Sequence, residues 1–168
     1  NIMAGYHEDE AATQHAITSD GWLRTGDLAT RDADGNLRIV GRSKDIIIRG
    51  GENIAPAEIE NVLREHPDIA DAAVVGVPDG RLGEIVGAAL ILRNGAKLQP
   101  KAYAKLLNGR VAKFKLPERW MALERFPLTG SGKVQKFKLR ELFAAARHGA
   151  GGWAAQPPPA AGGSGAAR

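Results

Sequence analysis

Two apolar segments, residues 69–79 and 84–93, follow each other with only a short loop containing Gly80 and Gly83 between them. Short apolar segments bounded by turn-forming residues are typical of β-strands, so we expect two neighbouring strands here. Patterns typical of helices lie before and after them in the chain. Strands that alternate with helices, and that are also direct neighbours, predict the α+β fold class, as a small domain built in three layers.

The rest of the chain supplies the other elements of such a domain. The turn-forming loop "DADGN" separates two strand-like segments and predicts a β-hairpin within residues 22–41, with Gly35 available for a positive φ. Pro56 stands where a first helical residue is expected, and apolar residues follow it at helical spacing up to His66. The remaining segments are expected to form a strand at 45–49, a helix at 100–110, a strand at 119–126 and a helix at 136–148.

The composition is that of an ordinary globular protein, with 168 residues, 43% of them hydrophobic and 25% charged. Cysteine is absent, which excludes disulfides and cysteine-based zinc sites. The four histidines lie far apart without ligand spacing, so no metal site is expected. No apolar run approaches the ~20 residues of a membrane span, and no secretory signal is recognised, so we expect a cytoplasmic protein.

The charge is unevenly distributed along the chain. Residues 1–100 carry 10 Lys and Arg against 16 Asp and Glu, whereas residues 101–147 carry 12 against three. A basic segment of this kind could bind nucleic acid or the phosphates of a small molecule, or could form a solvated face whose acidic counterpart lies elsewhere. No nucleic-acid-binding motif accompanies the charge, so nucleic acid is not an expected partner.

Three segments of the chain differ in character. Residues 1–43 contain the hairpin, which is too small to be stable alone and is expected to be the end of a larger preceding domain. Residues 44–146 contain strands and helices of their own and are expected to form one domain. Residues 147–168 are rich in Gly, Ala and Pro, with an isolated Trp153, and are expected to be a disordered tail. The chain begins with Asn1 rather than Met, which is typical of a fragment.

Four short stretches carry functional information through their order and spacing. They are "DGWLRTGDLATRDADGNLRIVGRSKD", "IIIRGGENIAPAEIE", "VVGVPDGRLGE" and "FPLTGSGKVQKFKLREL". Together they resemble the C-terminal portion of the adenylate-forming superfamily, which contains the acyl-CoA synthetases, the luciferases and the adenylation domains of peptide synthetases. The resemblance covers residues 1 to about 145 and is greatest to fatty-acyl and related carboxylate–CoA ligases.

The resemblance implies an ATP-dependent carboxylate–CoA ligase. In that family a carboxylic acid and ATP form an acyl-AMP, and the thiol of CoA then displaces AMP to give acyl-CoA. Mg²⁺ is also implied, with its ligands in the N-terminal domain that would precede this chain, together with the phosphate-gripping loop and the acyl pocket. The chain alone is therefore expected to be inactive, and its sequence does not name the carboxylic acid.

Asp27, in "TGD", and Arg42, just after the predicted hairpin, are the expected nucleotide-binding residues. An ionised carboxylate only accepts hydrogen bonds, so it suits the two adjacent hydroxyls of a ribose. The resemblance implies that Asp27 holds the ribose of AMP and that Arg42 acts at the same nucleotide. The plain alternatives are an exposed aspartate in a turn and a surface ion pair.

Lys133 is the expected catalytic residue. It stands in "LTGSGKV", a glycine-containing loop that can bring one ammonium group close to phosphate and carboxylate oxygens. The stretch is not a nucleotide P-loop, because Pro127 and Val134 occupy positions where that motif needs Gly and Ser or Thr. The resemblance implies that Lys133 bridges the acyl carboxylate and the α-phosphate during adenylation; the plain alternative is a solvated loop lysine. No role is assigned to the later basic residues Lys136, Lys138 and Arg140.

Lys44 is the expected hinge. The resemblance implies that the small domain rotates about it between the two half-reactions, and hinges in general are a few residues at the ends of elements. Gly50 and Gly51 allow the backbone to approach a ligand closely, and the resemblance implies that they line the channel for CoA. A tight turn or a β-bulge is the plain explanation of the same glycines. The phosphates of CoA are then the expected partner of the basic segment.

Two other functions fit the same stretches. An amino-acid-activating domain would load a carrier protein, but the sequence around Ser164 lacks the length and the helical context of a carrier domain. A non-catalytic binding module could have kept the fold, although Asp27, Arg42, Lys44 and Lys133 are all retained. We therefore expect the ligase, with a carboxylic acid, ATP, CoA and an N-terminal domain of the same chain as its partners.

Overall fold

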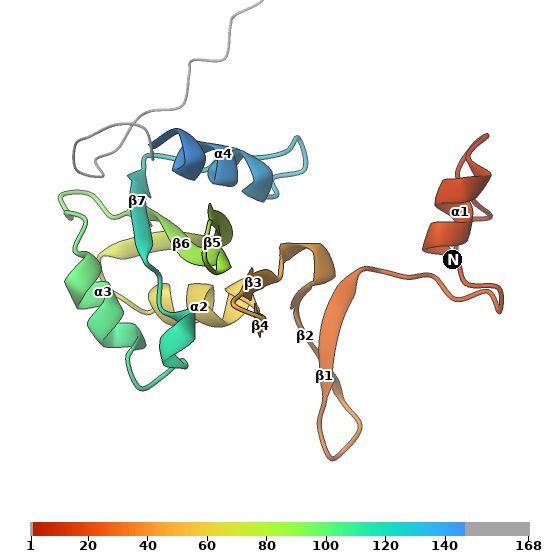
Figure 1. The fold of residues 1–168 in the computed structure, drawn as a ribbon, viewed down its shortest axis with the longest axis horizontal. Coiled ribbons are helices and arrows are strands. Elements are labelled where there is room, and N and C mark those ends of the chain that lie inside the picture. Colours follow the sequence, from red (N-terminus) through yellow and green to blue (C-terminus); the bar gives the residue numbers. More distant parts are fainter. Residues whose placement is uncertain (1, 147–168) are drawn as a thin grey trace, which may run out of the picture. The chain divides into compact units, whose positions relative to one another are not determined.

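The computed structural model describes residues 2–146, and the chain divides into two compact units. The first unit ends at Lys44 and the second begins at Asp45. Figure 1 shows the helices and strands of each unit. The tail predicted at residues 147–168, with Trp153, lies outside the described residues.

The first unit begins with a short helix, α1 (Glu10–Ala16), which the sequence patterns do not predict. The carboxylate of Asp9 caps it by accepting a hydrogen bond from the backbone N–H of Ala12 at 2.8 Å. Such a cap satisfies one of the free N–H groups that every helix start exposes. No residue of α1 is buried, so local hydrogen bonds rather than core packing hold this helix.

An antiparallel hairpin follows, formed by β1 (Asp27–Arg31) and β2 (Leu37–Arg42), as predicted. Its loop is closed by Asp32, whose carboxylate accepts hydrogen bonds from the backbone N–H and the side-chain amide of Asn36 at 2.8 and 3.0 Å. These bonds stabilise the ionised form and hold the pKa of Asp32 below its usual range. Gly35 has the positive φ that the turn calls for, at +88°.

The second unit is built on a five-stranded sheet whose long central strand is β6 (Gly83–Leu92). Strand β5 (Ile69–Asp79) pairs with it in antiparallel register along nearly its whole length. On its other side, β6 pairs with β3 (Ile47–Arg49) near its start and, in parallel, with β7 (Arg119–Leu123) near its end. Strand β4 (Glu52–Ile54) lies beyond β3, so that β5 and β4 end the strand order.

Helices cover both faces of this sheet (Figure 1). On one face, α2 (Pro56–Leu63) and α3 (Pro100–Leu107) contribute apolar side chains to a buried cluster. On the other face, α4 (Lys136–Ala146) contributes the fully buried Leu139 and Phe143 to a second cluster. The predicted α+β fold in three layers is therefore confirmed.

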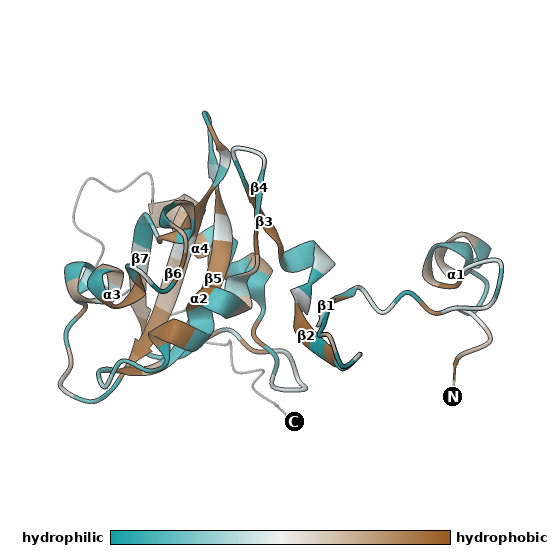
Figure 2. Ribbon diagram, turned by 90° about the horizontal axis from the view of Figure 1, so that it is seen from below, coloured by the Kyte–Doolittle hydropathy of each residue, from teal (hydrophilic) through white to brown (hydrophobic). Residues whose placement is uncertain are grey.

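Side chains of β5 alternate between the two clusters, as expected for a strand that is covered on both faces. Val74 is fully buried in the cluster of α2 and α3, and its neighbour Val75 is fully buried in the cluster of α4. Figure 2 shows the corresponding hydrophobic residues, in brown, along β5 and β6. The core of the second unit thus lies on both sides of one sheet.

The connection between β3 and α2 contains an additional strand, β4, which the sequence patterns do not predict. Strands β3 and β4 form a small hairpin, and β4 escapes prediction because Ile54 is its only buried apolar residue. Gly50 and Gly51 form its two-residue turn with φ values of +57° and +90°, as a type I′ turn requires. Ile47 is fully buried whereas Ile48 is 56% exposed, since neighbouring side chains of a strand point to opposite faces.

Two charged side chains fix this hairpin to the rest of the sheet. The Glu84 carboxylate, from the start of β6, accepts a hydrogen bond from the backbone N–H of Ile48 at 2.9 Å. The Arg49 guanidinium donates to Glu118, just before β7, at 2.8 and 3.1 Å. The Gly50–Gly51 turn is therefore held in a defined position at the end of the sheet.

Candidate functional site

Asp27 and Arg42 face each other across the hairpin of the first unit. They are register partners in β1 and β2, and Arg42 Nε lies 2.9 Å from Asp27 Oδ1. The side chain of Asp27 is 28% exposed and that of Arg42 is 47% exposed. The structure therefore brings together the two residues that the sequence predicts at the nucleotide, in the form of a partly exposed ion pair.

The backbone before Asp27 is held by Ser43, the residue after Arg42. Ser43 donates both its N–H and its hydroxyl to the carbonyl oxygen of Gly26, at 2.8 and 3.1 Å. Gly26 has φ +74°, in the left-handed region that favours glycine. The result is a carboxylate and a guanidinium on one fixed piece of backbone, where they can accept from hydroxyls and attract phosphate oxygens.

Lys44 is the last residue of the first unit and lies within a short 3-10 turn, η1 (Ser43–Asp45). Its side chain is exposed. Ser43 before it is fixed by its bonds to Gly26, and Ile47 after it is fixed by complete burial in the second unit. A backbone rotation at Lys44 would leave both sets of contacts intact, which is what a hinge needs; the hinge itself stays a prediction.

Lys133 lies at the end of a closed loop in the second unit. Thr129 organises this loop, because its N–H donates to Lys133 O at 2.8 Å and its hydroxyl accepts from Lys133 N at 3.1 Å. A bridge between Leu128 and Val134 closes the loop, and Gly132 makes its turn with φ +79°. The side chain of Lys133 is exposed, and its ammonium makes no ion pair with any carboxylate that the structure describes. It is therefore available for an anionic ligand.

A partly buried ion pair that the sequence patterns do not single out lies next to this loop. Lys136 Nζ is 2.9 Å from Glu60 Oε1, which also accepts a hydrogen bond from Val74 N at 2.8 Å. Glu60 is only 8% exposed. The sequence contained a signal for Glu60 but not for the identity of its partner, since Glu60 falls on the apolar face of α2 with Ile59 and Leu63, where a carboxylate needs a partner.

The basic segment is partly neutralised within the second unit. Arg110 donates to both carboxylate oxygens of Glu65 at 2.7 and 2.8 Å, and Lys115 Nζ lies 2.7 Å from Glu58. The Arg110 guanidinium holds the pKa of Glu65 below its usual range. Part of the charge asymmetry therefore reflects pairing between early acids and late bases.

The Gly50–Gly51 turn is anchored on one side and open on the other. Gly50 N–H donates to Leu82 O at 2.8 Å, which joins this turn to the neighbouring turn between β5 and β6. A Cβ added at Gly51 would meet no other heavy atom within 4 Å. The type I′ turn already explains both glycines, and the open side leaves space for a ligand; the predicted contact with CoA stays a prediction.

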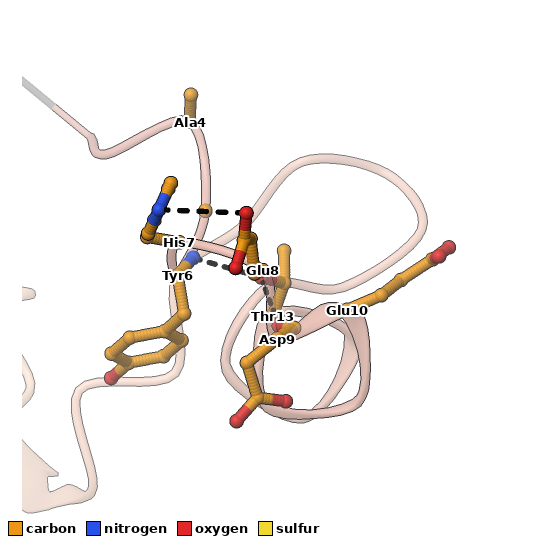
Figure 3. Close-up of a pocket in the computed structure, with 8 residues that line it drawn as sticks. Ala4, Tyr6, His7, Glu8, Asp9, Glu10 and Thr13 are labelled. Carbon is orange, nitrogen blue, oxygen red and sulfur yellow. Dashed lines mark hydrogen bonds and ion pairs between the residues drawn. The ribbon is translucent and has the colours of Figure 1, made fainter.

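A hollow in the first unit contains none of the predicted site residues (Figure 3). It is lined by residues 4–10 and Thr13, around the start of α1. Its contacts are local: Tyr6 N donates to Thr13 Oγ1 at 2.9 Å, and the strongly exposed His7 and Glu8 are 3.8 Å apart. These are features of a surface turn, so we assign the hollow no function.

Two further findings concern residues 2–146 as a whole. None of the helices there combines the length and the apolar character that a membrane crossing requires. Within the same residues, no three His, Asp or Glu side chains lie together in a way that could hold a metal ion.

Residues 58–133 match the family model described as the AMP-binding enzyme C-terminal domain. The match begins inside α2 and ends at Lys133, so it lies entirely within the second unit. It contains β5, β6, α3 and β7, which form most of the three-layered core.

The chain is also similar to individual proteins. It is 47% identical to the indoleacetate–CoA ligase of Aromatoleum aromaticum over 86% of this chain and 28% of that protein. It is 46% identical to the mitochondrial medium-chain acyl-CoA ligase ACSF2 of Bos taurus, over 83% of this chain and 23% of that protein. Among solved structures, the amide bond synthetase McbA from Marinactinospora thermotolerans superimposes with a TM-score of 0.78 and 40% identity, over 84% of this chain and 29% of that one.

The chain spans about a quarter of the length of the curated relatives it matches. The similarity extends beyond the family model, because it covers more than four fifths of this chain and so reaches into the first unit as well as the second.

Proposed function

We propose that this chain belongs to an ATP-dependent carboxylate–CoA ligase, because it carries the C-terminal domain of the AMP-binding, adenylate-forming enzymes. In the first half-reaction, a carboxylate oxygen of the acid attacks the α-phosphorus of ATP, acyl-AMP forms and pyrophosphate leaves. In the second, the sulfur of CoA attacks the acyl carbon, AMP leaves and the thiol proton is released. Similarity to two CoA ligases, at 46% and 47% identity, supports CoA as the acceptor.

The observation that carries the proposal is the state of Lys133. Its ammonium is exposed, lies at the end of a loop closed by Thr129 and Gly132, and has no carboxylate partner in the described residues. A positive charge that no described carboxylate neutralises can stabilise the negative charge that builds up as pyrophosphate leaves. We therefore assign Lys133 to the adenylation half-reaction, between the acyl carboxylate and the α-phosphate.

We assign nucleotide binding to Asp27 and Arg42. Their ion pair leaves the Asp27 carboxylate partly exposed, so it can accept hydrogen bonds from both hydroxyls of a ribose while it holds Arg42 in place. We assign the hinge between the two units to Lys44, which lies two residues after Arg42. We assign the passage of CoA to the open side of the Gly51 turn. The proposal assigns the ligands of Mg²⁺ to an N-terminal domain of the same protein.

A second candidate keeps the first half-reaction and changes the acceptor. The 40% identity to an amide bond synthetase favours an amine in place of CoA. The chemistry at the acyl carbon is parallel, since the amine nitrogen attacks, AMP leaves, the nitrogen loses a proton and an amide forms. Lys133, Asp27 and Arg42 would keep the same roles, so only the acceptor distinguishes the two candidates.

The test uses the full-length product of the gene. Pyrophosphate release is measured with ATP, Mg²⁺ and a panel of aliphatic and aromatic carboxylic acids, and the products are identified with CoA, with amines and with neither acceptor. The proposal expects a CoA thioester with at least one acid. An amide but no thioester would establish the second candidate, and the absence of pyrophosphate release with every acid would refute both.

A further inference from the structure

Glu60 is the one charged side chain that the structure buries among the residues it describes, and a buried carboxylate needs a reason. It lies on α2 and faces Val74 in β5, the strand at the edge of the sheet. Glu60 Oε1 accepts from the Val74 N–H at 2.8 Å, so it satisfies a backbone donor that no neighbouring strand can reach. This bond explains why residue 60 carries a hydrogen-bond acceptor. It does not explain the charge, because an uncharged glutamine would accept the same hydrogen bond.

The charge of Glu60 is explained by Lys136. Lys136 Nζ lies 2.9 Å from Glu60 Oε1, and the two side chains are 20% and 10% exposed. Arg64, on the next turn of α2, is more distant at 3.8 Å and also binds Asp71. Because α2 and α4 cover opposite faces of the sheet, the pair joins the two helical layers next to edge strand β5.

Gln135 and Lys136 are joined by backbone hydrogen bonds to the loop that carries Lys133. Gln135 N donates to Pro127 O at 2.8 Å, and Lys136 N donates to Val134 O at 3.1 Å. The loop therefore moves with the first residue of α4, and that residue is anchored to α2 through Glu60.

We propose that the Glu60–Lys136 pair positions Lys133 for adenylation, as a pair of positioning residues that do not touch the substrate. The inference rests on the proposed function of Lys133. Leu139 and Phe143 hold α4 against the sheet independently, because both are fully buried in the core. Loss of the ion pair should therefore release the start of α4 and its loop while the rest of the domain keeps its fold.

The test compares three variants in the full-length protein. Glu60→Gln keeps an acceptor for the Val74 N–H but removes the charge, and Lys136→Met keeps the aliphatic part of the side chain but removes the ammonium. Lys136→Arg keeps a cation that can still reach Glu60. Two rates are measured: ATP–pyrophosphate exchange for adenylation, and thioester formation from supplied acyl-AMP for the second half-reaction.

We expect Glu60→Gln and Lys136→Met to slow adenylation by about 10- to 100-fold, the effect of a displacement of roughly 1 Å at a reacting group. Thioester formation from acyl-AMP should stay close to wild type, and Lys136→Arg should largely restore adenylation. The double variant Glu60→Gln/Lys136→Met should be no slower than the slower single variant, because each change removes the same ion pair.

Lys115→Met is the matched control. Lys115 is also 20% exposed and also pairs with a glutamate of α2, Glu58, at 2.7 Å, but it has no backbone bond to the Lys133 loop. Its loss should leave adenylation unchanged. Normal adenylation in Lys136→Met would overturn the inference, and so would an equal loss of both half-reactions, which would mean a general structural role.

Lys133→Ala separates this inference from the proposed function. If Lys133→Ala adenylates normally, the proposed role of Lys133 fails and the positioning role fails with it. If Lys133→Ala loses adenylation while Glu60→Gln and Lys136→Met retain it, the proposed function stands and only the positioning inference is wrong.

Discussion

At the scale of single residues, the charged side chains of the candidate site differ in what surrounds them. Asp27 and Arg42 neutralise each other at 2.9 Å and remain partly exposed. Lys133 is exposed and meets no carboxylate of the described residues, whereas Lys136, three positions later, is mostly buried against Glu60. The environment therefore agrees with the distinction that the sequence motif makes between these two lysines: Lys133 is available to a ligand, and Lys136 is held within the fold.

Asp27→Asn should act mainly on ATP binding in the full-length enzyme. The substitution keeps the size of the side chain but removes its charge and replaces one acceptor oxygen with a donor. Hydrogen bonds to charged groups contribute about 1.5–3 kcal/mol, so we expect kcat/KM for ATP to fall by roughly 10- to 100-fold.

Steady-state pyrophosphate release at varied ATP concentration measures this effect. Asp34→Asn is the control, because Asp34 is an exposed carboxylate in the loop of the same hairpin and is not assigned to the site. Equal kcat/KM values for ATP in wild type and Asp27→Asn would show that Asp27 only stabilises the hairpin.

The sequence could identify Asp27, Arg42 and Lys133 as candidates because each stands in a recognisable motif. It could also predict that Asp27 and Arg42 belong to one site, and the structure puts them in direct contact. It could not predict the Glu60–Lys136 pair, because the two residues are 76 positions apart and only the three-layered packing brings them together.

At the scale of elements, segments rich in apolar residues were predictable, including the three-residue strand β3, and two short polar elements were not. The patterns predict β5, β6, α2, α3 and α4 because each has enough residues to show its period. Strand β4 has three residues and α1 has seven, none of them buried, so neither leaves a hydrophobic pattern. The glycines of the β3–β4 turn were ambiguous for a related reason: the same dipeptide serves a type I′ turn and a close approach to a ligand.

Gly50→Asn separates these two roles of the glycine pair. Asn-Gly is a preferred sequence for a type I′ turn, so the hairpin should keep its stability after a small shift of Leu82, whose Cδ2 lies 3.3 Å from the added Cβ. If CoA passes the turn closely, the new side chain should raise KM for CoA while ATP–pyrophosphate exchange stays normal. An unchanged KM for CoA would mean that the glycines serve only the turn.

Gly87→Ala should destabilise the second unit. Gly87 lies in the central strand β6, and an added Cβ would be 2.6 Å from Val77 Cγ2 and 3.2 Å from two ring atoms of Phe143. Overpacking of a core typically costs 1–3 kcal/mol, so we expect about that loss in the free energy of unfolding, measured with urea.

Gly80→Ala is the comparison for this substitution. A Cβ at Gly80, in the turn between β5 and β6, meets no heavy atom within 4 Å, so its effect should stay within about 0.5 kcal/mol. A Gly87→Ala protein as stable as Gly80→Ala would mean that α4 does not pack on β6 as closely as described.

At the scale of the whole molecule, the residues proposed for the reaction belong to two different units. Asp27 and Arg42 belong to the first unit and Lys133 to the second, and Lys44 is the residue at which one unit ends. Groups for one reaction that lie on both sides of a junction can be brought together in one half-reaction and separated in the other. Substitutions of these residues should therefore affect the two half-reactions differently.

The most direct measurement is the effect of Lys133→Ala on each half-reaction of the full-length protein. Loss of a preorganised charge in the transition state typically lowers a rate by about 100- to 1,000-fold. We therefore predict a loss of that order in ATP–pyrophosphate exchange, with thioester formation from supplied acyl-AMP close to the wild-type rate. Normal exchange in Lys133→Ala, or an equal loss in both half-reactions, would contradict the assignment of Lys133 to adenylation.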